Sequence, residues 1–273
     1  MLGVFDSGLG GLTVLRRLRE LLPAHDLLYF ADQANVPYGD RTPGELLQLT
    51  ERNVNRLNAA GVKAIIMACN TSCATAAELG WPHSDAPILD LIESAAIAVQ
   101  LAGYRNVGVI ATAATARSGA YAEAVGERTP DTHVTEIAAP ALVPLVEAGK
   151  LEGAEPRAAV AAVCAQLPDG VDAVVLACTH YPLLEAHFQA VLGPQVAIVD
   201  PARMHAQRAA ELVRRLEITP GSGSILCMTS GNLERFRGNL DTLIGDLHPD
   251  CCAAPGSEGV GASTEFAREG AGG

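Results

Sequence analysis

The feature that most constrains the fold is a short apolar segment that ends on a cysteine and occurs twice in the chain. Residues 64–68 lead directly into Cys69, and residues 173–177 lead directly into Cys178. Apolar runs of this length, bounded by small polar residues, are typical of strands buried in a parallel sheet. The sequence therefore predicts two buried strands that each carry a thiol at the carboxyl end.

Length and charge narrow the class of protein. With 273 residues and 49% hydrophobic composition, the chain can fill one large core or two medium ones. Its net charge of −12 and pI of about 5.0 disfavour nucleic acid and anionic membranes as partners, because both need a basic face. No apolar run reaches the roughly 18 residues that span a bilayer, and no signal-peptide pattern begins the chain, so we expect a cytoplasmic protein.

Strands and helices alternate along the first part of the chain. Capping residues, prolines and glycines mark the helix ends, notably the capping box and proline at 42–45. This alternation is typical of a parallel sheet with right-handed crossovers. The expected strands are 2–5, 27–31, 64–68 and 88–90, and the expected helices are 12–22, 42–60, 71–79 and 92–102.

The same pattern restarts near residue 107. Residues 108–112 resemble residues 3–7, and 66 positions separate Gly3 from Cys69 where 70 separate Gly108 from Cys178. We therefore expect an α/β fold of two similar domains with parallel-sheet cores and flanking helices, related by a pseudo-twofold axis, with the active site in the cleft between them.

The expected domains are discontinuous in sequence. A strand at 224–228 and a helix at 233–244 form no core alone, so they are expected to return to the first half. The first domain would comprise residues 1–95 and 208–247, and the second residues 96–207. Residues 248–273 are dominated by glycine, alanine and serine without periodicity, which predicts a disordered tail.

Ligands of open parallel sheets bind beyond the carboxyl ends of the strands. The residues expected there are small and polar, and they include two thiols, a carboxylate and an imidazole. This candidate site comprises Asp6, Ser7, Pro37, Tyr38, Gly39, Cys69, Asn70, Thr71, Thr112, Thr115, Cys178, Thr179 and His180.

Two thiols at strand-to-helix junctions point to acid–base chemistry. A helix amino terminus or an imidazolium lowers the pKa of a cysteine and favours its thiolate. Inversion of a carbon centre without a cofactor requires one base and one acid on opposite faces. Cys69 and Cys178 could fill these roles and exchange them when the reaction reverses.

Simpler interpretations remain open for the same residues. A single cysteine at a strand end is more often a small buried hydrophobe, Asp6 could be only a helix cap, and Glu147 could be a solvated helix residue. Gly8, Gly10 and Gly11 lack the spacing of a dinucleotide-binding turn. Cys69 and Cys73 could face one metal, but no partner pair with ligand spacing exists, so no metal is expected. The histidines interpreted as surface or loop residues are His25, His83, His133, His187, His205 and His248.

Four segments of the chain resemble the glutamate racemases of the cofactor-independent aspartate/glutamate racemase superfamily. The resemblance extends from residue 3 to about residue 245. Its motifs are Phe5-Asp6-Ser7-Gly8-Leu9-Gly10-Gly11-Leu12, Pro37-Tyr38-Gly39, Ala68-Cys69-Asn70-Thr71 and Cys178-Thr179-His180-Tyr181-Pro182-Leu183-Leu184.

The resemblance implies an activity and a role for each matched residue. The chain would interconvert L- and D-glutamate and supply D-glutamate for bacterial peptidoglycan, as a homodimer without a cofactor. Cys69 would act on D-glutamate and Cys178 on L-glutamate. Asp6 and His180 would assist proton transfer, with Glu147 supporting His180. The residues that would hold the substrate are Ser7, Pro37, Tyr38, Gly39, Asn70, Thr71, Thr112, Thr115 and Thr179.

Three alternatives stay open at this point. The chain could be an aspartate racemase or another thiol enzyme of the same superfamily. It could be a hydrolase or lyase that uses one cysteine as a nucleophile and forms a covalent adduct. It could also be a catalytically silent amino-acid-binding protein, which would tolerate the loss of both thiols.

Overall fold

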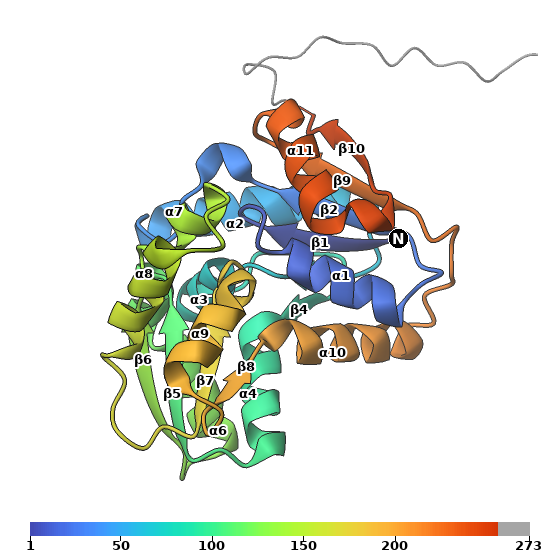
Figure 1. The fold of residues 1–273 in the computed structure, drawn as a ribbon. Coiled ribbons are helices and arrows are strands. Elements are labelled where there is room, and N and C mark those ends of the chain that lie inside the picture. Colours follow the sequence, from blue (N-terminus) through green and yellow to red (C-terminus); the bar gives the residue numbers. More distant parts are fainter. Residues whose placement is uncertain (256–273) are drawn as a thin grey trace, which may run out of the picture.

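The structure, a computed structural model, describes residues 1–255 and contains two sheets in which all strand pairs are parallel (Figure 1). The first sheet has the order β10-β9-β2-β1-β3-β4 and the second the order β6-β5-β7-β8. The strands are β1 (Leu2–Asp6), β2 (Leu27–Ala31), β3 (Ile65–Met67), β4 (Ile88–Asp90), β5 (Asn106–Ala111), β6 (His133–Ala138), β7 (Ala173–Ala177), β8 (Ala197–Val199), β9 (Ile225–Thr229) and β10 (Asp250–Ala253).

The two sheets repeat one topology, as the sequence predicted. The order β2-β1-β3-β4 in the first sheet corresponds to β6-β5-β7-β8 in the second, so β3 and β7 occupy equivalent positions. Cys69 and Cys178 follow these two strands, and they therefore stand at equivalent places in the two halves. Strand β9 pairs with β2, so the chain adds this later strand to the first sheet.

Helices cover both faces of each sheet. The α-helices are α1 (Leu12–Leu21), α2 (Pro43–Ala59), α3 (Asn70–Leu79), α4 (Leu91–Ala102), α5 (Ala113–Ser118), α6 (Ala120–Arg128), α7 (Leu142–Glu147), α8 (Ala154–Cys164), α9 (Glu185–Leu192), α10 (Pro201–Arg215) and α11 (Leu233–Ile244). The short 3₁₀ helices are η1 (Gln33–Asn35), η2 (Tyr181–Leu184) and η3 (Gly245–Leu247).

Alternation of side chains along the strands divides the interior into three cores. In β1, Val4 packs with α1, α10 and α11, whereas Phe5 packs with α2, α3 and α4. In β5, Val109 faces the Phe5 core, whereas Ile110 packs with α7, α8 and α9. The Phe5 core thus continues from one sheet to the other, and the two halves share buried apolar surface.

The entry to α2 is fixed by the predicted capping box. The side chain of Thr42 accepts from Glu45 N at 3.4 Å, and Thr42 N donates to Glu45 Oε2 at 3.0 Å. The helix ends at Ala59, and Gly61 follows with a φ of +71° that suits glycine. The capping box at the amino end of α2 anchors the chain immediately after the loop at residues 36–41.

Two strands were missing from the sequence prediction. Strand β6 is an edge strand in which polar residues separate Val134 from Ile137, so it carries no continuous apolar run. Strand β10 pairs with β9 through residues 250–253, so the prediction of a disordered tail from residue 248 was wrong for these residues. The rest of that predicted tail, residues 256–273, lies outside the described residues.

The surface assignment of His205 was also wrong. His205 is fully buried in α10, and its Nδ1 lies 2.8 Å from Ser94 Oγ on α4. Burial and the nearby Arg208 charge lower its pKa to about 3. The helical spacing indicates this burial, because Ala202 and Ala209 lie three and four positions from His205 on the same buried face of α10.

No helix within residues 1–255 is long and apolar enough to cross a membrane.

The two halves meet closely at the turn that follows β1. A Cβ placed on Gly10 would lie 2.6 Å from the carbonyl carbon of Thr179 and 2.7 Å from His180 N. These are backbone atoms of the second half, so neither can move aside as a flexible side chain would.

We therefore predict that Gly10→Ala destabilises the protein by about 1–3 kcal/mol, because the added methyl group must push the two halves apart. Urea denaturation followed by circular dichroism measures this change. Gly44→Ala is the matched control: Gly44 lies in the first turn of α2 with nothing within 4 Å of its Cβ position. That control should be neutral or slightly stabilising, and equal losses in both variants would contradict the prediction.

Candidate active site

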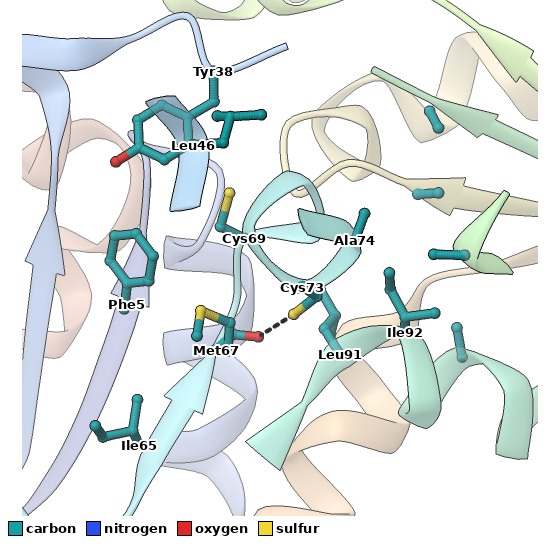
Figure 2. Close-up of a cluster of buried hydrophobic side chains, with 14 of the residues drawn as sticks. Phe5, Tyr38, Leu46, Ile65, Met67, Cys69, Cys73, Ala74, Leu91 and Ile92 are labelled. Carbon is teal, nitrogen blue, oxygen red and sulfur yellow. Dashed lines mark hydrogen bonds between the residues drawn. The ribbon is translucent and has the colours of Figure 1, made fainter. Parts of the chain in front are cut away.

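The first thiol is held at the start of α3. Cys69 is the N-cap residue of this helix and directly follows β3 and Ala68, and it is only 4% exposed. Figure 2 shows its sulfur on the side of Tyr38, whereas the Cys73 sulfur turns back toward β3 and donates to Met67 O at 3.6 Å. The two thiols of this helix therefore point away from each other, which opposes a metal site shared between them.

The environment of Cys69 does not lower its pKa. Burial and the negative charge of Asp6 raise the pKa of the thiol to about 12, although the nearby Ser72 and Ser7 act in the opposite direction. The lowered pKa predicted from the helix terminus was therefore wrong for Cys69. Desolvation and a neighbouring carboxylate outweigh the few N–H groups of one helical turn.

The second thiol has a different environment. Cys178 follows β7 and is 6% exposed, and its Sγ lies 3.7 Å from His180 Nδ1. The other ring nitrogen of His180 lies 2.6 Å from Glu147 Oε1. Cys178, His180 and Glu147 thus form a chain of thiol, imidazole and carboxylate.

This chain favours a charged imidazole. Burial alone would lower the pKa of His180, but the contacts with Cys178 and Glu147 outweigh it and raise that pKa well above its ordinary value. Burial likewise would raise the pKa of Glu147, yet its bond with His180 lowers it. An imidazolium therefore stands beside Cys178 Sγ.

Asp6 connects the two halves at the base of the site. Its Oδ2 accepts from Gly8 N at 2.9 Å, and its Oδ1 accepts from Thr179 Oγ1 at 3.0 Å. Tyr29 adds a bond from its hydroxyl to Gly8 O at 2.7 Å. The fully buried carboxylate thus fixes both the turn after β1 and the residue that follows Cys178.

Three threonine hydroxyls make a second bridge between the halves. Thr71 Oγ1 of α3 lies 2.9 Å from Thr112 Oγ1, and Thr112 Oγ1 donates to Thr115 Oγ1 at 3.0 Å. Thr115 N also donates to Thr112 Oγ1 at 3.2 Å, which caps α5. All three residues are nearly fully buried.

The loop after η1 forms one wall of the site. Tyr38 donates its hydroxyl proton to Asp32 Oδ2 at 2.6 Å and accepts from Asn53 Nδ2 at 3.0 Å. Gly39 O accepts from Ala114 N at 3.0 Å, and the Val36–Pro37 peptide bond is cis. The loop is therefore attached to the first half by Tyr38 and to the second by Gly39.

These elements enclose a cavity of ≈ 50 Å³, several times the roughly 10–15 Å³ that a single water requires. Seven of the predicted residues line it: Ser7, Pro37, Tyr38, Gly39, Thr71, Thr112 and His180. Its remaining lining residues were not predicted: Val36, Asp40, Ala113, Pro140, Val143 and Pro144.

The missed residues fall into two groups. Val36, Asp40 and Ala113 are neighbours in sequence of predicted residues. Pro140, Val143 and Pro144 belong to the apolar segment that precedes Glu147. Glu147 is the one predicted site residue of that segment, yet the segment follows β6 as the loop at 36–40 follows β2, so the repeat of the two halves indicates its position.

Other predicted residues lie outside the lining of this cavity. Asn70 is 3% exposed in the first turn of α3, and Thr179 is bonded to Asp6. Cys69 and Cys178 are likewise buried at their strand ends. No group of three or more His, Cys, Asp or Glu side chains within residues 1–255 is arranged to hold a metal ion.

Known proteins share this architecture of two parallel sheets. Crystal structures of two glutamate racemases superpose on most of the chain. The structure of isoform RacE1 from Bacillus anthracis has a TM-score of 0.88 at 27% identity, covering 94% of this chain and 98% of that one. The enzyme of Francisella tularensis, solved in complex with D-glutamate, has a TM-score of 0.82 at 28% identity, covering 92% and 95%. The fold is thus that of racemases of the two-domain α/β class.

Sequence comparison gives the family. Residues 3–209 match the Asp/Glu/Hydantoin racemase family. A glutamate racemase of Desulforudis audaxviator is 40% identical over 254 residues, covering 89% of this chain and 93% of that protein. One from Gloeobacter violaceus is 44% identical over 221 residues, covering 80% and 83%. The chain therefore belongs to the Asp/Glu/Hydantoin racemase family, and it is an amino-acid racemase, an isomerase.

The buried pair of Glu147 and His180 gives a prediction for stability. Replacement of Glu147 by Gln should cost about 2 kcal/mol near pH 5.5, because a charge-assisted bond inside the protein is lost. Urea denaturation of the variant and the wild type at several pH values measures the difference.

The pH dependence follows from the two pKa shifts. The pKa of His180 is raised, so its contribution is complete below its ordinary value of 6.5 and is lost as pH rises through the raised pKa. The pKa of Glu147 is lowered, so its contribution is present above 4.5 and is lost as pH falls through the lowered pKa. The cost should therefore shrink toward pH 3. Glu155→Gln, which removes an exposed partner of Lys150, is the control, and its free energy of unfolding should differ little from that of the wild type at pH 5.5 and at pH 3. A cost for Glu147→Gln that does not vary with pH would contradict the prediction.

Proposed function

We propose that this racemase interconverts L- and D-glutamate with Cys69 and Cys178 as its two proton-transfer groups. The observation that supports the proposal most strongly is the equivalence of the two thiols: each follows the corresponding strand of a repeated sheet. Two halves related in this way bring like groups to a common cleft from opposite sides. That arrangement suits removal of a proton from one face of a carbon and its return to the other.

The environments of the two thiols differ, and the difference suits the conversion of L-glutamate. In this direction Cys178, whose Sγ lies 3.7 Å from His180 Nδ1, is the group that removes the α-proton. The raised pKa of Cys69 keeps its thiol protonated and able to donate. The C–H bond on one face breaks as the Cys178 S–H bond forms, and the Cys69 proton then forms a new C–H bond on the opposite face.

The reverse direction begins with the thiolate that this step leaves at Cys69. The same thiolate can take the α-proton of D-glutamate, and Cys178 then returns a proton with His180 as its neighbour. Solvent exchange resets the two thiols between turnovers. The positive α-ammonium group of a bound amino acid would oppose the effect of burial and lower the pKa of Cys69.

The polar residues of the site suit an amino acid with two carboxylates. The first turn of α3 presents backbone N–H groups and the positive end of the helix dipole beside Cys69. Hydroxyls of Ser7, Thr71 and Thr112 border the same cavity. Since hydroxyl and backbone donors recognise carboxylates, we infer that these groups hold the substrate and stabilise charge that develops in the transition state.

Solvent deuterium tests the two-base mechanism. A thiol carries one proton, and the thiol that reprotonates the carbon carries a solvent-derived one. Early in a reaction in D₂O, the product should therefore contain deuterium at the α-carbon while the recovered substrate retains protium. Mass spectrometry of the separated enantiomers measures both. Product that keeps the original proton would indicate a single base and contradict the proposal.

Substitution of each thiol separates the racemase from its rivals. Cys69→Ala and Cys178→Ala should each lower racemisation by more than about 10³-fold, because each direction needs both groups. A hydrolase or lyase with one nucleophilic cysteine would survive one of these changes, and a binding protein would tolerate both. D- and L-glutamate and D- and L-aspartate can be offered in separate reactions followed by circular dichroism. The signal should decay faster for the glutamates than for the aspartates.

We also infer the domain division from the sheets. Every strand of the second sheet lies within residues 96–207, and every strand of the first lies outside it, which supports boundaries within α4 and α10. The first domain would then extend beyond residue 247 to include β10. A homodimer in the cytoplasm, making D-glutamate for peptidoglycan, is proposed from the resemblance to glutamate racemases.

A further inference from the structure

Tyr121 is a fully buried tyrosine whose hydroxyl contacts the site from the second half. It lies on α6, and its hydroxyl donates to Asn70 Oδ1 in a short hydrogen bond. Asn70 is the residue after Cys69 and belongs to the first half. The bond therefore crosses from one half to the other and ends on the neighbour of a proposed catalytic thiol.

The bond determines which way the Asn70 amide faces. An amide has one oxygen, which accepts, and one nitrogen, which donates two protons. The Tyr121 hydroxyl occupies Oδ1, whereas Nδ2 of Asn70 has no hydrogen-bond partner among residues 1–255, although the side chain is only 3% exposed. Two N–H donors of this nearly buried side chain are thus left for a ligand.

The electrostatics of the location favour an anionic ligand for these donors. Asn70 stands in the first turn of α3, where backbone N–H groups and the helix dipole already favour negative charge. With the opposite amide orientation, Oδ1 would face that ligand and repel a carboxylate. Burial raises the pKa of Tyr121 well above its ordinary value, so its hydroxyl keeps its proton as a donor.

The neighbouring residue is oriented from the same side. Thr71 Oγ1 meets Thr112 and Thr115 of the second half, as described above. The second half therefore sets the orientation of two consecutive polar side chains on α3. Tyr121 differs from Thr71 and Thr112 in one respect: those two threonines line the cavity, whereas the Tyr121 hydroxyl contacts Asn70.

We propose that Tyr121 is a positioning residue for substrate recognition: by occupying Asn70 Oδ1, its hydroxyl directs the Asn70 N–H groups toward a carboxylate of the bound amino acid. The inference rests on the proposed function and adds to it a role for a side chain of the other half. Because the orientation is set from across the interface, binding of the carboxylate depends on how the two halves are joined at α6.

Tyr121→Phe tests this role because it removes the hydroxyl and keeps the buried ring. The amide of Asn70 is then free to turn. KM for both glutamate enantiomers should rise about five- to tenfold, while kcat changes less than twofold, because the lost interaction serves binding. In the Cys69→Ser, Cys178→Ser background, which cannot turn over, isothermal titration calorimetry should show the same rise in Kd for D-glutamate.

A double-mutant cycle distinguishes positioning from a purely structural role. In an Asn70→Ala background, Tyr121→Phe should cause no further rise in KM, because the amide it orients is absent. Tyr181→Phe is the stability control. Within residues 1–255 its buried hydroxyl bonds only to Ala111 O and Ala139 O, so thermal unfolding of this variant measures the loss of a buried hydroxyl.

Two outcomes would overturn the inference. One is an unchanged KM in Tyr121→Phe. The other is a rise that persists in full in the Asn70→Ala background, which would make Tyr121 a packing residue only. Both are read against an active wild type. A wild type that racemises neither glutamate enantiomer would instead refute the proposed function, so the two failures are distinguishable.

Discussion

The buried carboxylate of Asp6 is the group on which the geometry of the site depends. Removing a carboxylate from water is costly unless its oxygens accept hydrogen bonds. Asp6 meets this need with Gly8 N on its own turn and Thr179 Oγ1 on the other half. Satisfying one buried charge therefore joins the end of β1 to the segment after Cys178. The Asp6 side chain also explains why position 11 is glycine, since a Cβ on Gly11 would lie 2.5 Å from Asp6 Cβ.

Asp6 also makes the two thiols chemically unequal. It adds to burial in raising the pKa of Cys69, whereas Cys178 has an imidazolium as its neighbour. A protein built from two similar halves thus holds two like groups in opposite electrostatic settings. For a racemase this is useful, because one group must give a proton while the other takes one, and the assignment must reverse with the direction of reaction.

Much of this arrangement could be predicted from the sequence, because it follows from local patterns. The apolar runs predicted β3 and β7, and the capping box predicted the start of α2. The sequence repeat predicted two similar halves. The pattern failed where burial is partial: β6 and β10 are edge strands, and such strands carry little apolar periodicity. His205 was missed because its neighbours on the buried face of α10 include alanines, which mark a core weakly.

The candidate site was predictable in membership and less so in its energetics. Strand ends identified seven of the cavity residues, whereas Pro140, Val143 and Pro144 required the correspondence between the loops after β2 and β6. The raised pKa of Cys69 could not be predicted from its helix position, since it depends on burial and on Asp6, a residue distant in sequence. The bond from Tyr121 to Asn70 likewise joins two helices of different halves, and no spacing in the sequence indicates it.

In the proposed mechanism, Cys69 and Cys178 approach opposite faces of one carbon. A crystal structure of the Cys69→Ser, Cys178→Ser variant with bound D-glutamate tests this arrangement. We expect the two serine hydroxyls on opposite sides of the substrate α-carbon, each within about 3–4 Å of it. Two hydroxyls on the same face, or one too distant for proton transfer, would contradict it.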